Sequence, residues 1–169
     1  MLRPIVRYGA DVLHHPAAAV EAITPEIQAL IDDMVQTMYA APGIGLAAPQ
    51  VGVGVRIFVC DISVGRNRAD LLTFVNPVFV EREGMQLEEE GCLSVPGFNA
   101  TVARPVRAIM KGLNRDGDEH VVEATGLLAR CFQHEMDHLD GTLFVDRLRG
   151  LQKDFIVRKI KKLTRAGKW

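Results

Sequence analysis

Two histidines and a glutamate lie in one short segment, Gln133–Gly141, at a spacing that suits metal-dependent hydrolysis. His134 and His138 are four residues apart, so on an α-helix their side chains share one face and can reach a single metal ion. Glu135 lies about 100° further round the helix, where it can take a proton from a water molecule held by the metal. This is the H-E-x-x-H arrangement of zinc-type hydrolases, in which the metal lowers the pKa of that water.

The residues around this motif favour a metal site over the alternative, two surface histidines that fall at helical spacing by chance. The segment is apolar nearly all round, which is the pattern of a buried helix. Its apolar residues are Leu127, Leu128, Ala129, Cys131, Phe132, Met136 and Leu139. Because two buried imidazoles and a buried carboxylate all need polar partners, a shared metal ion is an economical partner. We expect Thr125 to cap this helix and Gly141 to end it.

A catalytic site of this type needs a third protein ligand and one open position. The metzincin pattern would place a histidine at position 144, where the chain has Phe144, and the only acidic residues beyond Gly141 are Asp146 and Asp154. Cys92 is therefore the strongest unclaimed candidate. It follows three acids and a glycine in a strand-like region, where the alternative for an isolated cysteine is a small buried apolar side chain.

Helices and strands must position these groups. Thr24, Pro25 and Glu26 are typical of a helix start, and an apolar stripe follows until the chain reaches Pro42. The stripe consists of Ile27, Leu30, Ile31, Met34, Val35 and Met38. Between 55 and 122 the sequence predicts short strands at 55–60, 71–75, 78–81, 85–87, 106–113 and 119–122, with a hairpin turn at 114–117.

A last helix is predicted from about Leu148 to Leu163. Its inward residues are expected to be Leu148, Leu151, Phe155, Ile156, Ile160 and Leu163. With no repeat, low-complexity segment or linker, we expect residues 1–169 to form a single domain, and 169 residues suffice for its core. The sequence contains no apolar run of 18 residues that would predict a membrane span, and no secretion signal is apparent. Its three cysteines favour a reducing compartment, so we expect a cytoplasmic protein.

The segment Gly43–Gln50 is the second notable stretch. Its glycines and other small residues allow the backbone to approach a neighbour or ligand closely, and Gln50 is its one polar side chain. The alternative is a plain glycine-rich turn. It is not a nucleotide-binding loop, since no third glycine completes G-x-G-x-x-G and no lysine follows.

Three segments, taken in order, resemble the signature motifs of the peptide deformylase family. They are Gly43-x-Gly45-Leu46-Ala47-Ala48-x-Gln50, Glu90-Gly91-Cys92-Leu93-Ser94 and Gln133-His134-Glu135-x-Asp137-His138. The resemblance extends to the length and the C-terminal helix. It implies an α+β fold in which antiparallel β-sheets surround a central metal-binding helix. It also implies removal of the formyl group from the N-terminal formylmethionine of nascent peptides, with release of formate.

The resemblance also implies roles for individual residues. Cys92, His134 and His138 would bind the metal, and Glu135 would be the general base and acid. Gln50 and the backbone N–H of Leu93 would stabilise the oxyanion. Fe(II) is the metal that the resemblance implies, with Zn(II), Ni(II) or Co(II) as substitutes, and a set of one sulfur and two nitrogens is compatible with iron or zinc.

The resemblance places four residues in a pocket for the methionine side chain: Ile44, Gly45, Leu127 and Cys131. Arg130, nearby, is charged where many relatives carry an aliphatic residue, which puts the pocket wall in question. Glu90 and Arg104 are candidates for an ion pair near the metal; the alternative is that each is merely solvated.

Charge along the chain is uneven. Residues 147–169 hold nine of the 20 Lys and Arg and one of the 21 acidic residues, so they carry a net +8 against −9 for the other 146. A solvated helix face is the usual explanation of such a run. The substrate emerges from an RNA-coated particle, however, so we expect this basic helix to contact the ribosome. We expect no DNA or membrane partner.

Two rival classes remain open. A zinc endopeptidase would need an extended groove and an acidic or histidine third ligand. A metal-stabilised module without activity would need a fourth ligand, for which Cys60 and Cys131 are candidates.

Overall fold

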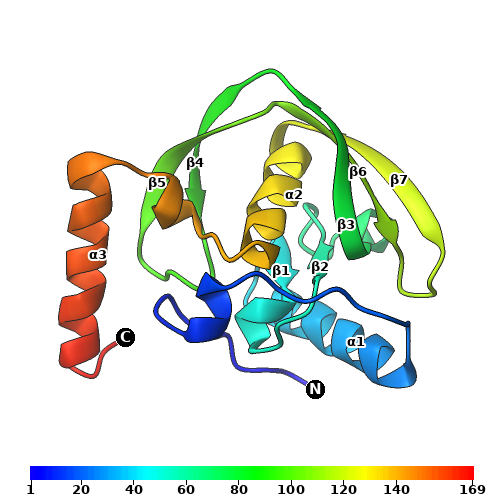
Figure 1. Ribbon diagram of the computed structural model, residues 1–169, viewed down its shortest axis with the longest axis horizontal. Coiled ribbons are helices and arrows are strands. Elements are labelled where there is room, and N and C mark those ends of the chain that lie inside the picture. The colour runs from blue at the N-terminus through cyan, green and yellow to red at the C-terminus, as the bar shows by residue number, and fades with distance from the viewer.

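The computed structural model describes residues 1–169, which form an α+β fold built around one central helix (Figure 1). Its helices are α1 (Pro25–Ala40), α2 (Gly126–Leu139) and α3 (Gly150–Arg165). Its strands are β1 (Gly45–Ala47), β2 (Ile57–Cys60), β3 (Leu72–Glu83), β4 (Gln86–Gly91), β5 (Asn99–Arg104), β6 (Arg107–Leu113) and β7 (Glu119–Thr125). An antiparallel sheet with the order β1-β2-β3-β6-β7 and a β4-β5 pair enclose α2, as the fold prediction required.

Helix α1 begins where its sequence predicts. The Ile27 N–H donates to the Thr24 hydroxyl at 3.2 Å, and proline occupies the first helical position. Its buried residues are Leu30, Ile31, Met34, Thr37 and Met38. This stripe packs α1 against β1 and β2, so α1 supports the short strand that carries Gly45.

Strand β3 unites two segments that the sequence predicts as separate strands, 71–75 and 78–81. Its pairing with β6 shifts register between Val75 and Val78, and Asn76 there has a φ of 51°. The Asn76 side chain both accepts from the Val20 N–H and donates to the Val20 carbonyl, each at 2.8 Å. These two bonds hold a bulge within one continuous strand instead of a break.

The hairpin between β6 and β7 is confirmed. The Asn114 side-chain oxygen accepts from the N–H groups of Asp116 and Asp118 at 2.9 and 3.0 Å. Strand β4 extends beyond the predicted 85–87, and β5 was not predicted. The inward positions of β5 are Ala100, Val102 and Arg104, so its apolar alternation covers only two inward residues before the buried arginine interrupts it.

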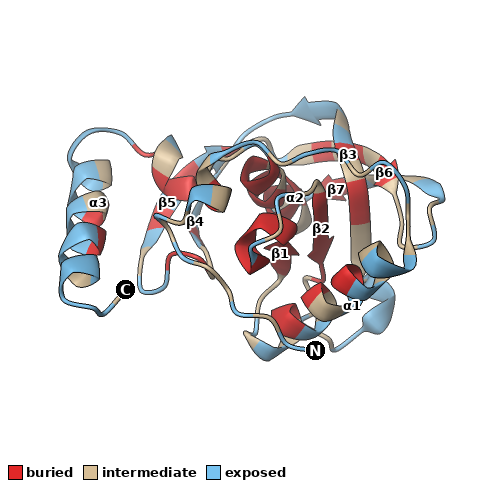
Figure 2. Ribbon diagram, turned by 60° about the horizontal axis from the view of Figure 1, so that its bottom comes forward, coloured by how far each residue is buried: buried red, intermediate tan, exposed pale blue.

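Helix α2 is buried as its composition predicts (Figure 2). Phe132 packs with Phe58 and Phe74 of the five-stranded sheet in the core cluster beside the site. Thr125, the last residue of β7, occupies the N-cap position of α2 as expected, but its side chain makes no capping hydrogen bond. Gly141 follows the last turn with a φ of 81°, the left-handed conformation expected of a terminating glycine.

Helix α3 stands at the side of the molecule (Figure 1). Ile156 and Ile160 are buried against the cluster that contains Leu148. The prediction that Leu151 and Phe155 point inward is wrong, because they are 87% and 59% exposed. Helix α3 docks along a narrow strip, and these two side chains lie beside that strip. No helix is both long and apolar enough to cross a membrane.

Candidate functional site

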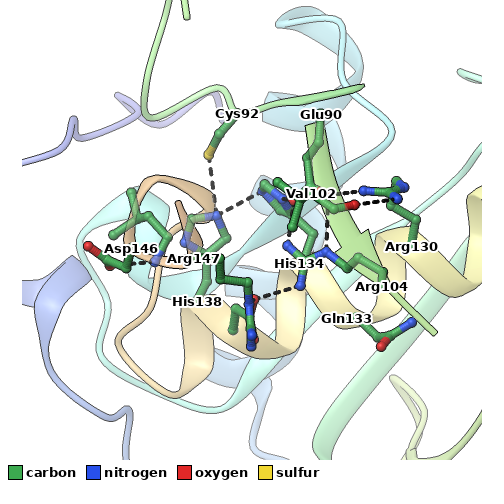
Figure 3. Close-up of polar contacts among 12 residues, drawn as sticks. Glu90, Cys92, Val102, Arg104, Arg130, Gln133, His134, His138, Asp146 and Arg147 are labelled. Atoms are coloured by element: carbon green, nitrogen blue, oxygen red, sulfur yellow. Dashed lines mark hydrogen bonds and ion pairs between the residues drawn. The ribbon is translucent and has the colours of Figure 1, made fainter. Parts of the chain in front are cut away.

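The structure brings Cys92, His134 and His138 together although Cys92 comes from a different part of the chain (Figure 3). Cys92 follows β4, and the two histidines lie on one face of α2. The Cys92 Sγ lies 3.3 Å from His138 Nε2, and the two Nε2 atoms are 3.2 Å apart. One sulfur and two nitrogens, all within 4.8 Å of one another, therefore converge on one point.

These three groups fit a metal ion. His134 Nδ1 bonds to Glu90 Oε1 at 2.6 Å, which turns its Nε2 towards His138. Burial, and then positive charge on His134, lowers the pKa of His138, which keeps its ring neutral. Burial also lowers the pKa of His134, but the Cys92 sulfur and the Glu90 carboxylate outweigh it and raise that pKa. The site thus favours positive charge where the donor atoms meet, and such a donor set suits Fe(II) or Zn(II).

Glu135 is buried beside this centre, and its Oε2 has no hydrogen-bond partner. Burial raises its pKa to about 7. Its carboxylate packs against Gly45 so closely that a Cβ on this glycine would lie 2.6 Å from Glu135 Oε1. The geometry therefore provides a carboxyl group able to exchange a proton near neutral pH.

Gln50 is held in one orientation. Its Oε1 accepts from the Ala47 N–H at 3.0 Å, so its Nε2 is turned towards Ser94 Oγ at 3.1 Å and Cys92 Sγ at 3.6 Å. The Leu93 N–H donates to no protein group. An amide and a backbone donor thus flank the converging ligand atoms. Ser94 is the last residue of the second motif, but the sequence assigns it no role, because its hydrogen bond to Gln50 depends on the tertiary structure.

Glu90 connects His134 to an arginine network. Arg104 donates to both Glu90 oxygens, from Nε at 3.0 Å and Nη2 at 2.5 Å, and Arg130 Nη1 donates to Oε2 at 2.6 Å. Burial raises the pKa of Glu90, but His134 and Arg104 outweigh it and hold that pKa well below its usual range. The ion pair between Glu90 and Arg104 is therefore present, and the solvated alternative is wrong. Arg104 also donates a hydrogen bond to Asp137, which accepts another from Arg147.

A cavity of about 410 Å³ opens beside these groups. Every residue predicted for the site lines it except His138, which lies fully buried behind. The lining residues are Ile44, Gly45, Gln50, Cys92, Leu93, Leu127, Cys131, His134 and Glu135. Arg130 also lines the cavity. Its guanidinium donates to Glu90 and to the carbonyl of Val102, so the charge that it brings to the cavity wall is paired with the Glu90 carboxylate.

The geometry agrees with the comparison of this chain with known proteins. The family model described as polypeptide deformylase matches residues 2–154. The chain belongs to the peptide deformylase family. The peptide deformylase of Acidobacterium capsulatum is 46% identical over 169 residues, which is all of this chain and 99% of that protein. The peptide deformylase of Xylella fastidiosa strain M12 is 48% identical over 169 residues, 98% of each chain.

Solved structures of the family share the fold. The peptide deformylase of Legionella pneumophila superimposes with a TM-score of 0.92 at 42% identity and covers 99% of this chain and 98% of its own. That of Synechococcus elongatus, solved in complex with actinonin, gives 0.88 at 39% identity over 95% of this chain and 90% of its own. Peptide deformylases are metal-dependent enzymes that remove the formyl group from an N-terminal methionine, and the chain is an enzyme of this kind.

Proposed function

We propose that the chain hydrolyses the formyl group of nascent formylmethionyl peptides at the point where Cys92, His134 and His138 converge. The observation that carries this proposal is three ligand atoms within 4.8 Å of one another beside the buried Glu135. The three side chains would hold Fe(II), with zinc, nickel or cobalt as substitutes. When bound, the ion polarises the formyl oxygen and acidifies the attacking water.

Glu135 moves the proton in this proposal. Its Oε2 accepts a proton from the attacking water and returns it to the departing amine nitrogen as the C–N bond breaks. Burial raises the pKa of Glu135, which favours uptake of the proton that it then passes to the amine. Glu135 is not needed as a ligand, since the three converging atoms come from other residues.

Gln50 and Leu93 stabilise the negative charge that develops on the formyl oxygen. The Ala47 N–H fixes the carbonyl end of the Gln50 amide, so its Nε2 donor needs no reorientation during the reaction. The free N–H of Leu93 offers a second donor on the same cavity. Ile44, Gly45, Leu127 and Cys131 would receive the methionine side chain, whose flexibility suits an irregular apolar slot.

The decisive experiment separates binding from chemistry. Glu135→Gln should retain one metal ion per chain and lose at least about 10²–10⁴ in kcat on a formyl-Met peptide. Glu89→Gln is the matched control, because Glu89 lines the same cavity but is exposed. Metal loss in Glu135→Gln, or turnover near that of the wild type, would count against this role. Comparable cleavage of unformylated casein would favour an endopeptidase instead.

We also propose that α3 binds the ribosome electrostatically. This binding would place the enzyme in the cytoplasm, where nascent chains emerge. Five cations of α3 are exposed: Arg158, Lys159, Lys161, Lys162 and Arg165. Ile156 and Ile160 anchor the opposite side of the helix to the body, so these cations can meet a polyphosphate surface without unfolding. Release of counterions would make such binding weaken steeply with salt.

Charge reversal at Lys159, Lys161 and Lys162 to Glu tests this. The variant should fail to co-sediment with ribosomes at low salt while its activity on a short formyl-Met peptide stays intact. Reversal at Arg66, Arg68 and Arg82, exposed cations outside α3, changes the net charge equally and should leave binding unchanged. Undiminished binding by the α3 variant would refute the proposal.

A further inference from the structure

Arg130 and His134 both reach the same carboxylate. They are four residues apart on α2, so they lie on one face of the helix. Glu90 receives a 2.6 Å bond from Arg130 Nη1 at Oε2 and a 2.6 Å bond from His134 Nδ1 at Oε1 (Figure 3). Glu90 thus spans one turn of α2, with a guanidinium on one oxygen and an imidazole on the other.

Hydrogen bonds to the β4-β5 pair fix the Arg130 side chain. Its Nη2 donates to the carbonyl of Val102 at 2.8 Å, and its Nε donates to Gln86 Oε1 at 3.3 Å. The residue is 5% exposed, so these bonds are sheltered from water. With its donors used in this way, Arg130 has little capacity left to recognise a polar substrate group in the cavity.

The two arginines on Glu90 differ in what else they hold. Arg104 is shared with Asp137, whereas Glu90 is the one carboxylate that Arg130 binds. Without Arg130, Glu90 Oε2 would keep only the 3.0 Å bond from Arg104 Nε. Arg104 would still contact both oxygens, but Oε2 would have lost its shorter bond, so the carboxylate would be held less firmly against His134.

We propose that Arg130 is a positioning residue for His134 that acts through Glu90. This inference rests on the proposed role of His134 as a metal ligand. A carboxylate that accepts from a ligand imidazole fixes the ring and raises its basicity, and loss of such support typically costs about 10–100-fold in metal affinity. Arg130 holds that carboxylate in place.

The test is the rate at which zinc-loaded protein releases zinc to an excess of a colorimetric chelator. Arg130→Met should release zinc about 10–100-fold faster than the wild type. Gln133→Met is the matched control: Gln133 is buried on α2 and donates to the Pro105 carbonyl at 3.0 Å, but it makes no bond to Glu90. This control should lose thermal stability and keep its release rate within about threefold of the wild type.

The remaining outcomes separate the possibilities. Wild-type release from Arg130→Met, or equal acceleration in both variants, would overturn the inference, because the second result reports helix anchoring alone. Arg130→Lys, which keeps one charged donor for Glu90, should fall between the wild type and Arg130→Met. If Arg130→Met does not fold, wild-type release from Arg130→Lys overturns the inference and faster release supports it. A folded wild type that binds no zinc would instead refute the metal site itself.

Discussion

Gly45→Ala places a methyl group directly against the proposed general base. A Cβ at Gly45 would lie 2.6 Å from Glu135 Oε1 and 2.8 Å from Cys131 Sγ, whereas ordinary contact begins at 3.4 Å. The Gly45 backbone is paired with Cys60 in the sheet, so the strand resists moving away. The Glu135 carboxylate must therefore shift by about 0.8 Å, the difference between 3.4 and 2.6 Å.

The size of this shift sets the expected loss of activity. Misplacement of a catalytic group by about 1 Å can cost about 10²-fold in rate, so we expect kcat to fall by about that factor. Overpacking in a buried site typically costs about 1–3 kcal/mol, which corresponds to a decrease in Tm of about 2–12 °C for a chain of this length. The three atoms nearest to the new methyl group belong to Glu135 and Cys131, not to the proposed ligands, so bound metal should remain.

The assay is steady-state hydrolysis of a formyl-Met peptide together with metal analysis and thermal melting. Gly54→Ala is the control, because the nearest atom to its Cβ would be Val12 Cγ2 at 3.8 Å. A folded, metal-loaded Gly45→Ala protein with kcat within about twofold of the wild type would refute the placement of Glu135 in the reaction. Loss of metal would show that the methyl group disturbs the ligands instead.

Three further outcomes are expected. Gln50→Ala should retain metal and lose about 10²–10³ in kcat, as for removal of one oxyanion donor, and an unchanged kcat would exclude Gln50 from the mechanism. Cys92→Ala should lose both metal and activity, and stoichiometric metal with normal turnover would show that the ligand set is wrong. Burial raises the pKa of Asp61, but hydrogen bonds from Ser63 and Tyr39 outweigh it and lower that pKa. The Asp61 carboxylate therefore stabilises the fold above about pH 4, and this contribution is lost as the pH falls through the folded-state pKa. Asp61→Asn should therefore reduce the free energy of unfolding by about 1–3 kcal/mol at pH 7, and the difference from the wild type should narrow in acid; urea titrations in which that difference stays constant with pH would contradict this.

Much of the site could be predicted from the sequence because its key relations are local. The four-residue spacing of His134 and His138 places both rings on one face of any α-helix, and the apolar flanks indicate that this helix is buried. The start of α1 depends on the hydroxyl of Thr24 and on Pro25, which act on the adjacent turn alone. Such features need no knowledge of distant partners.

Other features depend on contacts between distant segments, and only the tertiary structure decided them. Cys92 lies beside the histidines of α2 because it directly follows β4, which ends there. The local sequence around Cys92 does not reveal this proximity. Helical spacing places Arg130 on the face of His134. That its charged end turns away from the cavity depends on Glu90 and on the Val102 carbonyl of β5, a strand with only a short apolar pattern. Leu151 and Phe155 satisfy the same helical periodicity as Ile156 and Ile160, yet they remain exposed. Periodicity selects a face of a helix, whereas the width of the surface that it meets determines how much of that face is buried.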